Sequence, residues 1–343
     1  MTHVHILGTG GTIASRSGGH DAPEHDGDRG HALPKGSVAS VGVGELAANA
    51  GSTAEPGRGG LEVTSEDVLT VGSYRLGLGE LREIAAAVLR SAGDPDVDGI
   101  VVTHGTDTLE ESAFLVDLVN DTETPVVFTG AQRAADHADT DGPRNLRQSI
   151  AVAADPRFRG MGALVCFDGL VQSARGARKA HTLASQPFEG GAVVAEFAGE
   201  EIDVVARPER KGRVPLPPAA FGETRVDIVT AFPGSAPEAL LHAAERGAAG
   251  VVLAGTGLGN AGPGFAEAVA DLTRRGLPVV LASRALAGPV LPVYGNGGGV
   301  DLIAAGAVSA GRLNPFQARI LAACLLAGRP SLTDFTRRFS ELR

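Results

Sequence analysis

Short apolar runs alternate with stretches of helical spacing through the first two-thirds of the chain. The apolar runs predict strands at residues 4–7, 61–63, 68–71, 100–102, 126–128 and 163–167. The helical spacing predicts helices at residues 81–89, 108–119 and 145–154. Continuous apolar runs are typical of parallel strands that are buried on both faces. This order of elements therefore predicts a mostly parallel sheet flanked by helices on both sides.

A second alternating block follows a charged and then proline-rich stretch at residues 208–224. It predicts strands at residues 226–231, 251–254 and 279–282 and helices near residues 238–245 and 266–274. Asn314 before Pro315 predicts the start of another helix, because a capping residue precedes a proline in the first position. We therefore expect an α/β protein with two domains: a larger N-terminal domain (residues 1–207), a linker (208–224) and a smaller parallel α/β domain (225–343).

Composition narrows the class of protein. The chain has 343 residues, 43% of them hydrophobic, and 30 basic against 40 acidic residues give a net charge of −10, which argues against nucleic acid and anionic membrane as partners. The first strand begins almost at Met1 and no apolar run approaches membrane-spanning length, so we expect a cytoplasmic protein. Cys166 and Cys324 lie within apolar runs and are expected to be buried core thiols.

Two threonine-bearing turns carry the candidate chemistry. Residues 8–15 read GTGGTIAS and residues 103–111 read THGTDTLEE, and each turn follows an apolar strand. Each turn therefore places hydroxyl groups at the carboxyl end of a strand, where open α/β sheets bind their ligands. The glycines before Thr12 would let backbone amides converge into an anion nest. A dinucleotide fingerprint is the rival interpretation, but the residues after Ser15 form a poor helix.

In the second turn, Thr108 and Glu111 have the spacing of a capping box, which gives those two residues a structural role. That explanation leaves Thr106 and Asp107 displayed between strand and helix. Lys179 lies in a basic cluster, ARGARKAHT, and would ordinarily be a solvated lysine. It becomes an amine base only if the fold brings it to Thr106. The segment at residues 20–31 holds three histidines and four carboxylates, but it fits no metal-ligand spacing and is better explained as a mobile lid.

These motifs, in this order, resemble the bacterial-type L-asparaginase/glutaminase family across nearly the whole chain. Further matching motifs are TGAQ (129–132), DGPRNL (141–146), DG (168–169), GLGN (257–260) and LNP (313–315). The resemblance implies a cytoplasmic-type amidohydrolase that converts L-asparagine to L-aspartate and ammonia without metal or cofactor. It also implies a homodimer or homotetramer with active sites at the contacts between subunits.

The resemblance assigns roles to single residues. It implies that Thr12 is the nucleophile and that Thr106, Asp107 and Lys179 form a second cluster, in which Lys179 accepts a proton. Asp107 would also bind the α-amino group of the substrate and Ser73 its α-carboxylate. The remaining substrate-binding positions by this resemblance are Tyr74, Ala131 and Asn260.

Three positions depart from the family pattern. The only tyrosines are Tyr74 and Tyr294, so the tyrosine usual in the family's lid has no counterpart. Tyr74 stands where secreted members carry a glutamine, and the glutamate lent by a neighbouring subunit has no match. We expect Tyr294 or Asp301 of a partner subunit to substitute for one of these. A glutaminase, another ω-amide hydrolase and a weakened amino-acid-binding relative remain alternatives.

Overall fold

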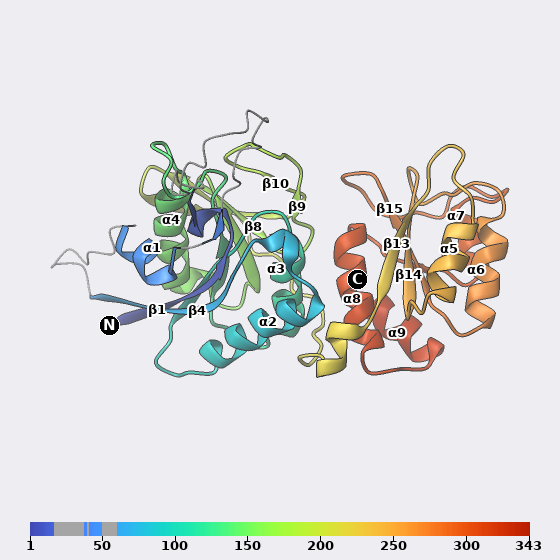
Figure 1. The fold of residues 1–343 in the computed structure, drawn as a ribbon, viewed down its shortest axis with the longest axis horizontal. Helices are drawn as coiled ribbons and strands as arrows, with labels where there is room; N and C mark the ends of the chain where they lie inside the picture. The colour runs from blue at the N-terminus through green and yellow to red at the C-terminus, as the bar shows by residue number, and fades with distance from the viewer. Residues whose placement is uncertain (17–37, 40, 50–59) are drawn as a thin grey trace, which may run out of the picture.

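The computed structural model describes residues 1–16, 38–39, 41–49 and 60–343, and its dominant element is an eight-stranded sheet (Figure 1). The strand order is β12-β11-β8-β7-β6-β5-β1-β4. Its strands are β1 (Thr2–Gly10), β4 (Leu61–Val71), β5 (Gly99–Thr103), β6 (Val126–Thr129), β7 (Ala163–Phe167), β8 (Leu170–Ser173), β11 (Val193–Ala198) and β12 (Glu201–Val204). The neighbouring strands β4, β1, β5, β6 and β7 are parallel, as predicted, whereas β8, β11 and β12 pair in antiparallel fashion.

The change to antiparallel pairing begins at Asp168 and Gly169. Both residues have positive φ, 47° and 83°. A two-residue turn with positive φ at both positions matches the twist of a hairpin and returns the chain directly alongside β7. The predicted strands at 61–63 and 68–71 are in fact one strand, β4. This strand lies at the edge of the sheet, where polar residues are tolerated because one side faces solvent.

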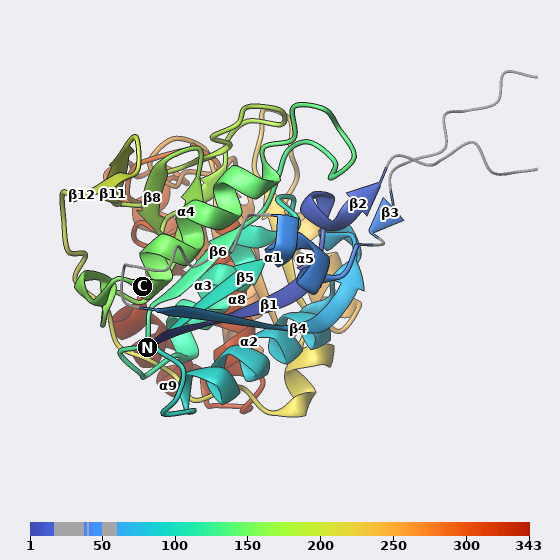
Figure 2. The ribbon, with the colours of Figure 1, turned by 90° about the vertical axis from the view of Figure 1, so that its left-hand side faces the viewer.

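Helices cover both faces of the large sheet, as Figure 2 shows. On one face lie α2 (Leu78–Ala92) and α3 (Leu109–Val119), and on the other lie α4 (Gly142–Ala154) and the short α1 (Val43–Asn49). Each face has its own cluster of buried apolar side chains. The predicted helices thus form where expected, with α2 and α4 starting three residues earlier than the apolar spacing suggested.

The second sheet has four parallel strands in the order β13 (Val226–Thr230), β14 (Gly250–Gly255), β15 (Val279–Ser283) and β16 (Val308–Ser309). One face packs against α5 (Glu238–Glu245) and α6 (Phe265–Arg274), with α7 (Gly299–Ala304) beside α6, and the other packs against α8 (Pro315–Leu326). The last helix, α9 (Leu332–Leu342), packs against α8. The Asn314 side chain caps α8 by accepting a hydrogen bond from Gln317 N at 2.9 Å, which confirms the predicted start.

The two sheets share one hydrophobic cluster. Helix α8 packs against its own sheet and, on its other side, against α3 of the large domain (Figure 1). The predicted linker takes part in this packing: Val214 N donates to Leu118 O at 2.9 Å, and Phe221 is fully buried in the short helix η4 (Ala219–Glu223). Burial of this area fixes the two sheets relative to each other.

Cys166 and Cys324 are free and buried, as predicted. No helix in the described ranges is long and apolar enough to cross a membrane. Among those same residues no group of histidine, cysteine and carboxylate side chains could hold a metal ion. The histidine- and carboxylate-rich segment at 20–31 lies outside the described residues.

Candidate active site

The two threonine-bearing turns are neighbours at the carboxyl edge of the large sheet. Strands β1 and β5 pair in parallel, with Gly8 opposite Thr103. Gly11 has φ +82°, and a Cβ atom there would lie 2.3 Å from Gly105 N. Only glycine can therefore stand at this point, because the backbones of the two turns touch. Residues 8–15 and 103–111, nearly a hundred residues apart in the sequence, form a single site.

The Thr12 turn is short, and one of its backbone amides is already hydrogen-bonded within the protein. A single 3-10 turn, η1 (Thr12–Ala14), follows the glycines, so no helix opens as a dinucleotide fingerprint requires. The Gly11 amide donates to Val71 O at 3.1 Å, so this one amide is not available to the anion nest expected here. Thr12 itself is half-buried, and its hydroxyl has no hydrogen-bond partner among the described residues.

The second turn brings three predicted residues together. Lys179 Nζ donates to Thr106 Oγ1 at 2.8 Å and to Asp107 Oδ1 at 2.7 Å. Thr106 is buried, the Lys179 side chain is 17% exposed, and the Asp107 side chain is 54% exposed. Asp107 is therefore open to a solvent-borne ligand, whereas the contact between Lys179 and Thr106 is sheltered from water.

Thr106 has a second partner that the sequence did not suggest. Its hydroxyl donates to Gln132 Oε1 at 3.4 Å. An ammonium group can only donate, so Thr106 Oγ1 must accept from Lys179 and turn its own proton elsewhere. The Nε2 atom of Gln132 is buried and has no hydrogen-bond partner within the described structure. TGAQ was matched as a family motif, but the sequence offered no signal for this contact.

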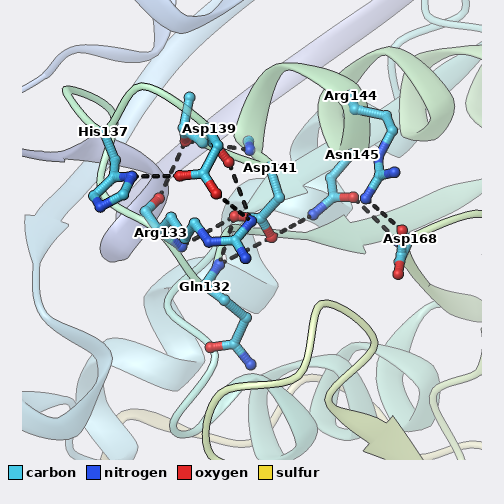
Figure 3. Close-up of polar contacts among 10 residues, drawn as sticks. Gln132, Arg133, His137, Asp139, Asp141, Arg144, Asn145 and Asp168 are labelled. Atoms are coloured by element: carbon cyan, nitrogen blue, oxygen red, sulfur yellow. Dashed lines mark hydrogen bonds and ion pairs between the residues drawn. The ribbon is translucent and has the colours of Figure 1, made fainter.

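Asp141 holds the segment that carries Ala131 and Gln132 (Figure 3). Its carboxylate accepts from Gln132 N at 3.1 Å, Arg133 N at 3.0 Å and Asn145 Nδ2 at 3.2 Å. Ala131 is fully buried. In Figure 3 the Gln132 side chain points away from this carboxylate, which leaves it free to meet Thr106. A buried carboxylate with three donors is a rigid support for the site.

Lys179 reaches Thr106 because the smaller domain holds its loop. Lys179 lies on β9 (Arg178–Lys179), which pairs with β10 (Phe188–Glu189). From α8, the fully buried Gln317 accepts from Gly176 N at 2.9 Å and donates to Ala174 O at 2.8 Å and Ala177 O at 3.2 Å. Asn314 Nδ2 also donates to Ala177 O at 3.3 Å. The helix that joins the two domains therefore fixes the approach of Lys179.

The predicted capping box at α3 is wrong. Thr108 makes no side-chain cap; its hydroxyl donates to Ser73 O at 2.9 Å instead. Ser73 is buried, and a Cβ on Gly105 would lie 2.5 Å from its Oγ. Thr108 thus ties the start of α3 to the segment that contains Ser73. The neighbouring Tyr74 is 73% exposed.

His104 supports the second turn from beneath. Its ring is fully buried, with Nδ1 2.7 Å from Gly105 O and Nε2 2.9 Å from Ser112 Oγ. A carbonyl oxygen only accepts, so Nδ1 carries the proton and Nε2 accepts from Ser112. Burial lowers the pKa of His104 to about 4, which keeps the ring neutral at physiological pH.

Three predicted residues lie in the smaller domain, apart from this cluster. Asn260 Oδ1 accepts from Gly299 N at 2.9 Å, and Asp301 Oδ2 accepts from Gly297 N at 2.5 Å. Tyr294 is 58% exposed in the same group of loops. No hydrogen bond or ion pair joins any of them to Thr106, Asp107 or Lys179 in the described structure. Within one chain, these residues are not brought to the two turns.

A cavity of about 740 Å³ lies between the two domains, and the predicted site residues do not line it. Two of the arginines that line it are already engaged. Arg175 donates to Leu342 O at 2.9 Å and pairs with Asp117, and Arg210 donates to Asp117 O and Asn120 O. The hydrogen bond of Arg175 with Leu342 O ties the large domain to the last helix, whereas the contacts with Asp117 and Asn120 hold Arg175 and the linker residue Arg210 within or against the large domain.

Comparison with known proteins places the chain in a family. Residues 3–210 match the family Asparaginase, N-terminal, and residues 225–339 match the Glutaminase/Asparaginase C-terminal domain. Together these matches span nearly the whole sequence. The protein therefore belongs to the asparaginase family.

Individual relatives agree with this assignment. The chain is 37% identical to a probable L-asparaginase of Deinococcus radiodurans, over 99% of this chain and 98% of the relative. It is 32% identical to a probable periplasmic L-asparaginase of Haemophilus influenzae, over 76% and 74%. The crystal structure of a probable cytoplasmic L-asparaginase from Campylobacter jejuni matches with a TM-score of 0.82 and 25% identity, over 99% and 100% of the two chains. The two-domain α/β fold is thus the fold of this family.

Proposed function

We propose that this protein hydrolyses the side-chain amide of L-asparagine to give L-aspartate and ammonia. The observation that carries the proposal is the contact of Lys179 with Thr106 and Asp107, directly beside the turn that contains Thr12. A threonine hydroxyl is a weak nucleophile and needs a nearby base. The site places the Thr12 hydroxyl and a sheltered amine in adjoining turns, a combination that suits nucleophilic hydrolysis of an amide.

In the proposed reaction, Thr12 Oγ1 attacks the amide carbon of the substrate. The proton that leaves the nucleophile passes to Lys179, with Thr106 between them, and then to the departing ammonia. Water attacks the resulting ester of Thr12 and releases the acid. To accept this proton, Lys179 must be a neutral amine: Thr12 gives its proton to Thr106 Oγ1, while the Thr106 proton turns from Gln132 Oε1 to Lys179 Nζ. Backbone amides near Thr106 would stabilise the oxyanion.

Substrate recognition is proposed for the residues around the two turns. The half-exposed Asp107 carboxylate binds the α-amino group, and Ser73 binds the α-carboxylate. Tyr74 and Ala131 border the substrate, and Asn260 approaches it from the smaller domain. We further propose a homodimer or homotetramer in which Tyr294 or Asp301 of one copy reaches the site of another. Tyr294→Phe and Asp301→Asn should each lower turnover or raise KM, and normal kinetics in both would reject this part.

The domain limits and the compartment are also proposals. We place the large domain at residues 1–207, the linker at 208–224 and the small domain at 225–343, which accords with the two family matches. Similarity to the probable cytoplasmic L-asparaginase of Campylobacter jejuni supports a place in the cytoplasm. Fractionation of cells that produce the protein would test this, since a periplasmic pool would contradict it.

Glutamine is the second candidate substrate, because the family matched by residues 225–339 covers glutaminases as well as asparaginases. Ammonia release from asparagine, glutamine and other ω-amides would rank the substrates. The wild type should release ammonia from asparagine, and Thr12→Ala should reduce the rate at least about 1000-fold. Full activity in folded Thr12→Ala would remove Thr12 as the nucleophile, and an inactive wild type would favour a binding role.

A further inference from the structure

Glu110 is a residue of the second turn to which neither the capping-box prediction nor the family resemblance gave a role. It lies in the first turn of α3, three residues after Asp107, and is only 4% exposed. Its Oε2 atom accepts a hydrogen bond from the backbone N–H of Lys179, 69 residues away in the sequence. A buried carboxyl group is costly to desolvate, so its partner is an informative contact.

The position of Lys179 depends on such a contact. Strand β9 has two residues and pairs with only two residues of β10. A hairpin this short is not stable by itself. Residues 181–183, which follow it, are exposed. On the other side, Gln317 and Asn314 hold residues 174–177, but they do not contact Lys179 itself.

Among the described residues, Glu110 is the only side chain that hydrogen-bonds to the Lys179 main chain. Thr106 and Asp107 lie just before α3, so they are on the same stretch of chain as Glu110. The Glu110 contact therefore holds the backbone of Lys179 against the start of α3. Thr106 and Asp107, which the ammonium group of Lys179 contacts, lie just before that helix. A shift of the lysine backbone by about 1 Å would break those contacts, and misplacement of this size is costly in catalysis.

The charged groups around Glu110 come from three elements. Arg178 and Lys179 face it from β9, and Glu111 adjoins it on α3 with Arg319 of α8 beyond. Burial raises the pKa of Glu110 to about 7, against the opposing hydrogen bond from Lys179 N and the charges of Arg178 and Lys179. Burial and the Glu110 charge raise the pKa of Glu111 to about 8. A charged acceptor binds an N–H group more tightly than a neutral one, so the contact strengthens above neutral pH.

We propose that Glu110 is a positioning residue for Lys179, which it holds against Thr106 and Asp107 by anchoring the lysine backbone to the start of α3. This inference rests on the proposed amidohydrolase function, in which Lys179 is the proton acceptor. It assigns Glu110 no contact with substrate.

The first test reads the contact without any substrate. The chain has three lysines, Lys35, Lys179 and Lys211, so ¹⁵N-lysine labelling gives three backbone amide resonances. The Lys179→Arg variant identifies the Lys179 resonance by its absence. In the wild type this resonance should move with a midpoint near pH 7, as Glu110 titrates. The movement should persist in Glu111→Gln and vanish in Glu110→Gln; persistence in Glu110→Gln would overturn the proposal.

The second test reads the catalytic consequence through kcat and KM between pH 5.5 and 9. Glu110→Leu removes the acceptor at similar size and should lower kcat at least about tenfold while KM changes less than threefold. Glu110→Gln keeps an acceptor oxygen, so it should retain most of kcat but lose a rise in kcat near pH 7. Glu111→Gln, one residue away, should keep that rise. A folded Glu110→Leu with wild-type kcat would overturn the proposal.

The two tests separate this inference from the proposed function. If the Lys179 resonance titrates as expected but no amide is hydrolysed, the positioning contact stands and the amidohydrolase proposal fails. If the enzyme hydrolyses the amide but the Lys179 resonance titrates in the same way in Glu110→Gln, the amidohydrolase proposal stands and the positioning proposal fails.

Discussion

The Thr12 turn and the Thr106 turn both follow a parallel strand of the large sheet, and their backbones touch at Gly11 and Gly105. Their hydroxyl groups are held very differently. Thr106 Oγ1 accepts from Lys179 and donates to Gln132, and its turn is tied to Ser73 through Thr108. The Thr12 hydroxyl, in the described part of the structure, has no partner.

This difference fits two separate roles within one site, proton transfer for the Thr106 turn and attack on the substrate for the Thr12 turn. A group that transfers protons must keep a fixed geometry, because proton transfer depends on hydrogen-bond distance. A nucleophile must also pass its proton to a base, and such a contact often tightens only when substrate is bound. The organised turn would then be the one that handles protons, and the less constrained turn the one that bonds to substrate.

Removal of the amine should have the largest effect. Lys179→Met keeps the unbranched shape of the side chain up to Cε but removes both hydrogen bonds to the second turn. We expect kcat to fall about 1000-fold, within the usual range for loss of a general base. Ammonia release measured with asparagine would show this. Arg178→Met on the same strand is the control and should cost less than tenfold; equal losses would mean that general positive charge matters.

Separation of the two turns should come next in size. In Gly11→Ala the new Cβ would lie 2.3 Å from Gly105 N, so the turns must move apart. We expect the free energy of unfolding to fall by about 3 kcal/mol and the activity to be lost as well. Gly160→Ala is the matched control, since Gly160 also has positive φ, +73°, but nothing lies within 4 Å of its Cβ position. It should cost about 1 kcal/mol in urea unfolding; equal costs would mean that backbone strain alone decides.

Acid should weaken the second turn through His104. The pKa of His104 is about 4 in the folded protein and 6.5 in the unfolded chain. Between these values the unfolded protein binds more protons, so the free energy of unfolding falls as pH drops from 6.5 to 4, by about 3 kcal/mol. His104→Asn cannot take up this proton.

The difference in unfolding free energy between the wild type and His104→Asn should therefore shrink between pH 7 and pH 4.5. Glu110 and Glu111, whose raised pKa values act in the opposite direction, are present in both proteins and cancel. A difference that is constant with pH would show that the pKa of His104 is the same in the folded and unfolded protein.

Replacement of Thr12 or Thr106 by serine should have the smallest effect on kcat, and it tests the difference between the two turns most directly. Serine lacks the β-branch that restricts χ1. Two hydrogen bonds still orient the hydroxyl in Thr106→Ser, so kcat should fall less than threefold. Thr12→Ser has no such support in the described structure, and kcat should fall about tenfold. Single-turnover rates would measure both, and a larger loss in Thr106→Ser would reverse the proposed roles.

Much of the fold could be predicted from the sequence because its signals are local. The continuous apolar runs of β1, β5, β6 and β7 reflect burial on both faces, and the Asn314 cap lies within its own helix. The antiparallel strands β8, β11 and β12 were missed, although Asp168-Gly169 is a sequence signal for a hairpin. The capping box failed because Thr108 found a more favourable partner, Ser73, outside its helix.

The sequence by itself determined the family, the parallel strands β1, β4, β5, β6 and β7 with helices α2, α3 and α4, and the two turns that carry Thr12, Thr106 and Asp107. Only the tertiary structure decided that Lys179 meets Thr106 across 73 residues, and that Glu110 and Gln317 hold the lysine segment. It also separated Asn260, Tyr294 and Asp301 from the cluster within one chain. The physical reason is that a turn or a cap is fixed by neighbouring residues, whereas the approach of Lys179 depends on the packing of a short hairpin between α3 and α8.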